Sequence, residues 1–178
     1  NERPFSILER VRYGNERTRE DAERLADESM RIADAFGLPP IREYDVEVQE
    51  SYDLQHSFEC AALNAAGVPA ITAELGSSRV IEELNRRVAI RGSRNVLRYM
   101  DVLPEDPLPN EAAPASPVEY PVKRVVGPVA PDAGIVRYDV EPGDVVESGD
   151  PVADVVSPHG HVQSTVESDQ EGYVLARR

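Results

Sequence analysis

The spacing of apolar residues changes period within the first forty residues of the chain. Residues 5–13 alternate between apolar and polar side chains, which is typical of a strand. Apolar residues then recur at helical spacing over 18–36, where Thr18 followed by Asp21 forms an approximate capping box. Gly37 and two prolines come next, so the helix should end there. The pattern predicts a strand followed by a helix.

Three further elements follow upstream of residue 104. A short helix is predicted over 54–66, ending at Gly67. Residues 68–76 are mainly apolar, as in a strand that is buried on both faces. A long helix should then span about 79–100. Its apolar positions are Val80, Leu84, Val88, Val96, Leu97 and Met100. The order strand, helix, strand, helix predicts an α/β fold class and part of a layered domain.

The last third of the chain has a different pattern, made of six short β runs. Turns of the Pro-Gly-Asp, Ser-Gly-Asp and Pro-His-Gly type separate them. The runs cover residues 125–128, 134–140, 144–146, 152–156, 161–166 and 172–177. A weak internal echo relates 131–137 to 169–175, so we expect two similar halves. This pattern predicts a small, closed, all-β barrel-sandwich-like domain.

A proline-rich segment separates the two patterns. Six of the fifteen prolines fall within residues 104–121. Such a segment can neither continue a helix nor occupy a central strand, so it should act as a semi-rigid linker. We therefore expect an α/β domain over 1–103, a linker over 104–117 and a β domain over 118–178.

The charge balance narrows the possible partners and suggests a habitat. The 178 residues include 33 Asp and Glu against 19 Lys and Arg, a formal net charge of −14. Such a surface repels phosphate groups, which disfavours nucleic acid and anionic membranes as partners. All basic residues except Lys123 are arginines. An acidic, lysine-poor composition is typical of halophilic proteins, so we expect the protein to gain stability in salt.

Cysteine and hydropathy suggest the compartment. Cys60 is the single cysteine, so no disulfide can form within the chain, and a reducing compartment is favoured. No apolar run approaches the ~20 residues that a membrane-spanning helix needs. We therefore expect a cytoplasmic protein.

Glu74 is the strongest candidate for a catalytic residue. It stands at the carboxyl end of the apolar run 68–76, before a Gly-Ser-Ser loop and the long helix. Ligand sites in open α/β sheets gather at such strand ends. Partial burial would also raise the pKa of the carboxyl group toward the range of a general base. Alternatively, Glu74 is a solvated residue at a strand end, or caps the next helix.

Histidine and cysteine give weaker signals. His56 and Glu59 have the His-x-x-Glu spacing that can place two metal ligands on one helical face, but no third ligand stands nearby. His159 and His161 should lie at a solvated hairpin tip. Cys60 is more simply interpreted as a packed core residue.

Residues 141–152 resemble the hairpin-rich half of lipoyl and biotinyl carrier domains. Those domains carry their cofactor on a lysine at the hairpin between the two halves. That hairpin should fall near Ser157–His161, which contains no lysine. The sequence therefore disfavours a carrier function.

Several motifs in order resemble the succinylglutamate desuccinylase/aspartoacylase family of zinc-dependent deacylases. The main match is Gly67-Val-Pro-Ala-Ile-Thr-Ala-Glu-Leu-Gly76, followed by a helix containing Asn95-Val-Leu-Arg98. Ala35-Phe-Gly-Leu-Pro39, Glu141-Pro-Gly-Asp144 and Ser157-Pro-His-Gly160 match further family habits. The resemblance covers nearly the whole chain. It implies that residues 1–103 are the end of a zinc-carboxypeptidase-like catalytic domain.

The resemblance also implies a reaction. In that family a Glu at the position of Glu74 acts as general base to a zinc-bound water, which attacks the amide carbonyl of an N-acyl amino acid or a similar small acyl compound. The zinc ligands of the family lie upstream of the region matched here, so the chain should bind zinc poorly alone. An alternative is an inactive remnant whose β domain gates a site or mediates contacts in a homo-oligomer.

Overall fold

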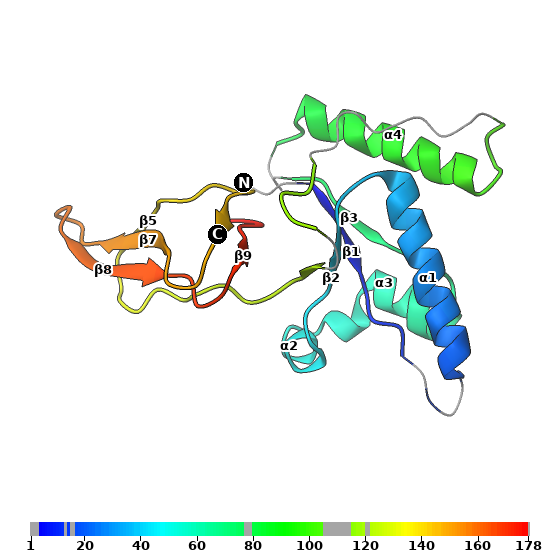
Figure 1. Ribbon diagram of the computed structural model, residues 1–178, viewed down its shortest axis with the longest axis horizontal. Coiled ribbons are helices and arrows are strands. Elements are labelled where there is room, and N and C mark those ends of the chain that lie inside the picture. Colours follow the sequence, from blue (N-terminus) through cyan, green and yellow to red (C-terminus); the bar gives the residue numbers. More distant parts are fainter. Residues whose placement is uncertain are drawn as a thin grey trace. The chain divides into compact units, whose positions relative to one another are not determined.

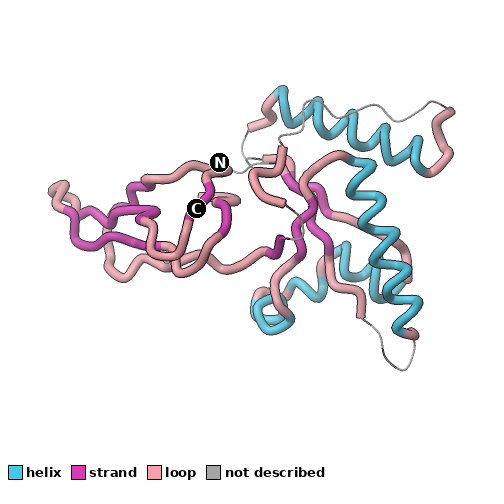
Figure 2. The backbone as a smooth tube through the Cα atoms, viewed as in Figure 1, coloured by secondary structure: helices cyan, strands magenta, loops and turns pink. Residues whose placement is uncertain are grey.

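The computed structural model describes residues 4–12, 14, 17–76, 80–104, 115–119 and 122–177. The chain divides into two compact units. One comprises Pro4–Ala115 with Tyr120–Arg124, and the other Ser116–Glu119 with Val125–Arg178. The described helices all belong to the first unit, and the second contains strands and turns (Figure 2). Most of the predicted linker, residues 105–114, lies outside the described residues.

The first unit is built on a mixed sheet of four short strands (Figure 1). They are β1 (Phe5–Leu8), β2 (Pro40–Arg42), β3 (Thr72–Glu74) and β4 (Val122–Lys123), in the order β3-β1-β2-β4. Strands β1, β2 and β4 run parallel, whereas β3 runs antiparallel to β1. The prediction of a doubly buried strand over 68–76 is wrong, because β3 lies at the edge of the described sheet and its residues are half-buried.

Helix α1 (Arg19–Phe36) confirms the helix predicted over 18–36. The Thr18 hydroxyl accepts a hydrogen bond from the Asp21 N–H at 3.1 Å, which satisfies one of the free donors at the helix start. Gly37 ends the helix in the left-handed conformation, at φ 83°, and donates its N–H to Ala33. The capping residues therefore set both ends of α1.

Helix α4 (Glu83–Tyr99) forms where a long helix was predicted, but it buries a different face. Of the predicted apolar positions Val88 is fully buried, whereas Leu84, Leu97 and Met100 are exposed. The remaining buried residues are Asn85, Gly92, Asn95 and Arg98. Gly92 explains this choice, because a Cβ there would lie 2.5 Å from the Phe36 ring of α1. The close approach of the two helices, more than the number of apolar side chains, selects the buried face.

The helix predicted over 54–66 is divided into three pieces. A 3₁₀ turn covers Leu54–His56, α3 covers Phe58–Cys60, and a π-helical segment covers Ala61–Ala66 before Gly67. The break occurs at Ser57, whose backbone is extended and whose hydroxyl accepts the Cys60 N–H at 3.2 Å. Strand β2 and the short helix α2 (Val46–Ser51) were not predicted from the sequence.

The second unit contains two small antiparallel sheets. One has the order β5-β7-β8, and the other pairs β6 with β9. The strands are β5 (Ile135–Tyr138), β6 (Val145–Val146), β7 (Pro151–Val156), β8 (Val162–Glu167) and β9 (Gly172–Tyr173). The described residues form no closed barrel. A core of Ala153, Val155 and Val166 is small, and all of β5 is exposed, so nothing described closes the sheet.

Two aspartates stabilise turns of this unit by accepting backbone hydrogen bonds. The Asp144 carboxylate accepts the Glu141 N–H at 2.7 Å, and the Asp150 carboxylate accepts the Glu147 N–H at 2.8 Å. A glycine with positive φ precedes each of these aspartates. The two turns are therefore equivalent. The β7–β8 turn falls at Ser157–His161, as predicted, and contains no lysine.

None of the described helices combines the length and the apolar character that a membrane span requires.

Candidate functional site

Glu74 is the last residue of β3, directly opposite Phe5 of β1. Side chains alternate along a strand, and Ile71, Ala73 and Leu75 pack against the apolar core formed with α1 and α4. Thr72 and Glu74 must therefore project from the other face of the sheet. The half-buried Glu74 stands at the end of β3, on the side away from that core, and because β3 is antiparallel to β1 this end lies beside the start of β1.

The chain after Glu74 is held closely by helix α4. Gly76 has φ +93°, and a Cβ on it would lie 2.3 Å from Nδ2 of Asn85. Asn85 is 7% exposed and donates a hydrogen bond from Nδ2 to Oε2 of Glu82 at 3.1 Å. Only glycine combines this backbone conformation with such a close contact. The strand end therefore has a defined support.

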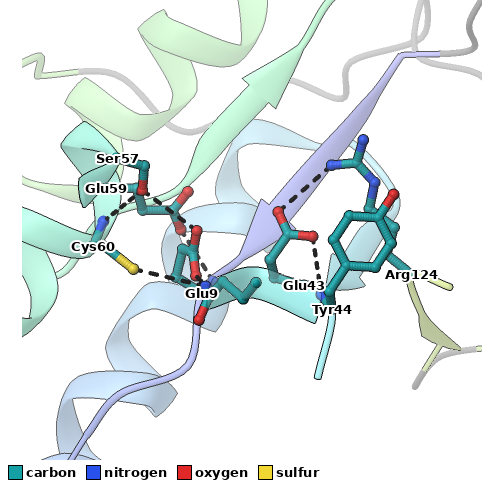
Figure 3. A network of polar contacts seen from close by, with 8 residues as sticks. Glu9, Glu43, Tyr44, Ser57, Glu59, Cys60 and Arg124 are labelled. Atoms are coloured by element: carbon teal, nitrogen blue, oxygen red, sulfur yellow. Dashed lines mark hydrogen bonds and ion pairs between the residues drawn. The ribbon is translucent and has the colours of Figure 1, made fainter. Parts of the chain in front are cut away.

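A second cluster of polar groups lies at the carboxyl ends of the three parallel strands (Figure 3). Glu9 directly follows β1, Glu43 follows β2, and Arg124 follows β4. The Arg124 guanidinium lies 3.5 Å from Oε2 of Glu43 and 4.7 Å from the centre of the Tyr44 ring. The Tyr44 N–H donates to Oε1 of Glu43 at 2.9 Å. Parallel strands thus bring together charged residues that are distant in sequence.

Glu59 on α3 is the most deeply placed acid of this cluster. It is 3% exposed, and its Oε1 accepts the Glu9 N–H at 3.2 Å. Its Oε2 has no hydrogen-bond partner of normal geometry among the described residues. Burial raises the pKa of Glu59 to about 7, and the charges of Glu9 and Glu43 add to the effect. The Thr72 hydroxyl and the Glu9 N–H oppose this rise without cancelling it.

The Glu9 carboxylate joins the cluster to Cys60. It accepts a hydrogen bond from the Gln49 amide, whose nitrogen also lies 3.7 Å from the Cys60 sulfur, and it interacts with the Cys60 thiol. Burial raises the pKa of Glu9 as well, and burial together with the Glu9 charge raises the pKa of the Cys60 thiol. Cys60 is buried, as predicted, but its interaction with the Glu9 carboxylate was not predicted from the sequence. A thiol whose pKa is raised is a poor nucleophile.

Glu74 and Glu9 lie beside opposite ends of strand β1. Glu74 is paired with Phe5 at the start of β1, whereas Glu9 follows the end of that strand. Four residues of extended chain separate Phe5 from Glu9, which is about 13 Å. Glu59 nevertheless connects the cluster to β3, because it interacts with the Glu9 N–H and with the hydroxyl of Thr72, which projects from the same face of the strand as Glu74.

The described residues do not fit a zinc site. They contain no group of three or more His, Cys, Asp or Glu side chains that could hold a metal ion. His56 is exposed and lies 3.7 Å from Asp53, whereas Glu59 is buried against Glu9, so this pair does not converge. His159 and His161 are exposed at the β7–β8 turn.

The chain resembles solved structures over nearly its whole length. It matches the product-bound ectoine utilization protein EutE (DoeB) from Ruegeria pomeroyi with a TM-score of 0.72 and 17% identity, covering 98% of this chain and 48% of that one. A succinylglutamate desuccinylase/aspartoacylase from Rhodobacter sphaeroides gives 0.68 and 16%, covering 97% and 47%. A succinylglutamate desuccinylase from a Silicibacter species gives 0.63 and 20%, covering 97% and 47%.

These matches establish the fold. The chain spans about half the length of the solved structures, and it shares their fold over that span. Named members of the family whose motifs the sequence resembles are among these neighbours. No protein-family model matches the sequence, and no curated protein sequence matches it.

Proposed function

We propose that this chain is the C-terminal portion of a zinc-dependent deacylase. The complete protein would cleave the amide bond of N-acyl amino acids or similar small acyl compounds, with Glu74 as general base. One observation carries the proposal. The chain has the fold of about half of proteins named as succinylglutamate desuccinylases and aspartoacylases, and the Glu of the resembling motif stands at a strand end in that fold.

The chemical part of Glu74 follows from its position. A carboxylate oxygen takes a proton from the attacking water and later gives the same proton to the leaving nitrogen of the amide, so no proton is gained or lost by the enzyme. The carboxylate of a general base must be held in a fixed orientation toward the water, and it also needs a suitable pKa. Here the cross-strand partner Phe5 and the core packing of Leu75 restrict the backbone on both sides of Glu74.

Zinc would have to be held outside the described residues, because these offer no ligand set. We propose that the ligands come from an upstream His-x-x-Glu loop and Asp-Leu-His strand end. A bound zinc ion would polarise the carbonyl and lower the pKa of a bound water.

We further propose that the second unit is a barrel-sandwich-like domain.

An experiment on two forms of the protein tests the proposal. The complete protein should bind one zinc ion per chain and hydrolyse an N-acyl amino acid, whereas residues 1–178 alone should bind less than one and show no turnover. Metal analysis after removal of free zinc and an amine-release assay measure both properties. A complete protein without zinc or turnover would instead favour the inactive remnant. Stoichiometric zinc and turnover in residues 1–178 alone would contradict the placement of the ligands upstream.

A further inference from the structure

Helix α4 contacts the two residues that follow Glu74. Leu75 packs against the cluster of Phe36, Leu38 and Val88, which joins α1 to α4. Gly76 lies so close to Asn85 that a Cβ on the glycine would be 2.3 Å from Nδ2 and 3.2 Å from Cγ of the amide. Asn85 precedes Val88 by one helical turn on the buried face of α4. The backbone that leaves β3 is therefore supported from one side along two consecutive residues.

Asn85 is itself held in place. It is buried, and its amide donates to Oε2 of Glu82, the residue that precedes the first turn of α4. A buried amide is costly unless it is hydrogen-bonded, so a small apolar residue would be the simpler filling if packing were the only need. The Asn85 side chain is thus hydrogen-bonded to the residue before α4 and lies close to Gly76, two residues after the end of β3. On the other side, Glu74 is paired with Phe5.

We propose that Asn85 is a positioning residue for Glu74. By supporting Gly76 it sets the direction in which the chain leaves the sheet, and with it the place of the Glu74 carboxylate. This inference rests on the function proposed above. Asn85 acts through the backbone and touches no reacting atom. A displacement of about 1 Å in a reacting group can lower the rate about a hundredfold, so a small shift of the strand end is enough to matter.

A pair of variants separates positioning from general destabilisation. In the complete protein, Asn85→Ala should lower kcat at least about tenfold and leave KM within about threefold, because an interaction needed only in the transition state is lost. Asn95→Ala is the matched control. Asn95 is also a buried amide of α4, 3% exposed, and accepts a hydrogen bond from Arg98 at 3.3 Å. It should lower the melting temperature to a similar extent but leave kcat within about threefold. Equal losses of kcat in both variants would overturn the proposal.

A second readout needs no activity. In residues 1–178 alone, hydrogen exchange of the backbone over 70–76 should become faster in Asn85→Ala and stay unchanged in Asn95→Ala. Unchanged exchange in Asn85→Ala would also overturn the proposal. Normal turnover of a Glu74→Gln enzyme would overturn the proposed function itself, and the exchange experiment would still report whether Asn85 supports the strand end.

A double-mutant experiment tests whether the contact between Gly76 and Asn85 affects kcat. Gly76→Ala places a methyl group against the Asn85 amide and should lower kcat in the otherwise native enzyme. Alanine at φ +93° is strained in either background, but in an Asn85→Ala background the clash with the amide is absent, so Gly76→Ala should lower kcat by a smaller factor. Equal factors in the two backgrounds would show that the contact does not position Glu74.

Discussion

Replacing Glu59 with Gln should stabilise the protein at high pH and leave its stability nearly unchanged at low pH. Glu59 is buried between β1 and α3, and its pKa in the folded protein is about 7 against an ordinary value of 4.5. Folding therefore favours the protonated carboxyl group. The favourable contribution is fully present below the unfolded pKa and is lost as pH rises through the folded pKa, so stability should fall between about pH 4.5 and pH 7.

The size of the effect follows from the shift. One pKa unit corresponds to about 1.4 kcal/mol, so a rise from 4.5 to about 7 amounts to about 3 kcal/mol. Above pH 7 the native protein carries this cost, because a carboxylate is buried beside Glu9. Glutamine has nearly the same shape, and its oxygen can still accept the Glu9 N–H. We therefore expect Glu59→Gln to be more stable than the native chain by up to about 3 kcal/mol at about pH 8, and by less than about 1 kcal/mol at about pH 5.

Urea unfolding of residues 1–178 at several pH values measures this difference. Both chains also contain Glu9, whose pKa is raised by burial, so the difference between native and variant reports Glu59 together with its effect on Glu9. Glu20→Gln, at an exposed position of α1, is the matched control for the loss of a carboxylate. A constant difference between native chain and Glu59→Gln from about pH 5 to about pH 8 would refute the reasoning, because it would mean that Glu59 titrates alike in the folded and unfolded chains.

Two further outcomes are expected. The net charge of −14 should lower stability in dilute buffer, so the melting temperature of residues 1–178 should rise in molar sodium chloride; an equal melting temperature in both conditions would count against the halophilic interpretation. Gly92→Ala should lower the free energy of unfolding in urea by about 1–3 kcal/mol, because the new methyl group would clash with the Phe36 ring. Gly127→Ala is the control and should have little effect, because nothing lies within 4 Å of a Cβ at that position. Equal effects of the two substitutions would show that the close contact between α1 and α4 is not required.

Local signals in the sequence predicted the parts of the fold that local chemistry determines. Both ends of α1 could be predicted from Thr18, Asp21 and Gly37, because a capping residue interacts with backbone groups within one helical turn. The Ser157–His161 turn and the strand end at Glu74 are visible for the same reason.

The rest depends on contacts between distant segments. The buried face of α4 could not be chosen from hydrophobicity, because Gly92 against Phe36 decides it and two asparagines share that face. The carboxyl cluster was missed because Glu9, Glu43 and Arg124 meet only when three strands align. One signal was available, since a charged residue follows each of these strands. It could be used only once β2 and β4 had been recognised as strands.

The proposed role of Glu74 as the general base of a deacylase can be tested with a single substitution. In the complete protein, Glu74→Gln should lower kcat for hydrolysis of an N-acyl amino acid by about 10²–10⁴, the usual size of a general-base contribution, while zinc content and the melting temperature stay close to native. Near-native turnover by Glu74→Gln at full zinc content would contradict the assignment.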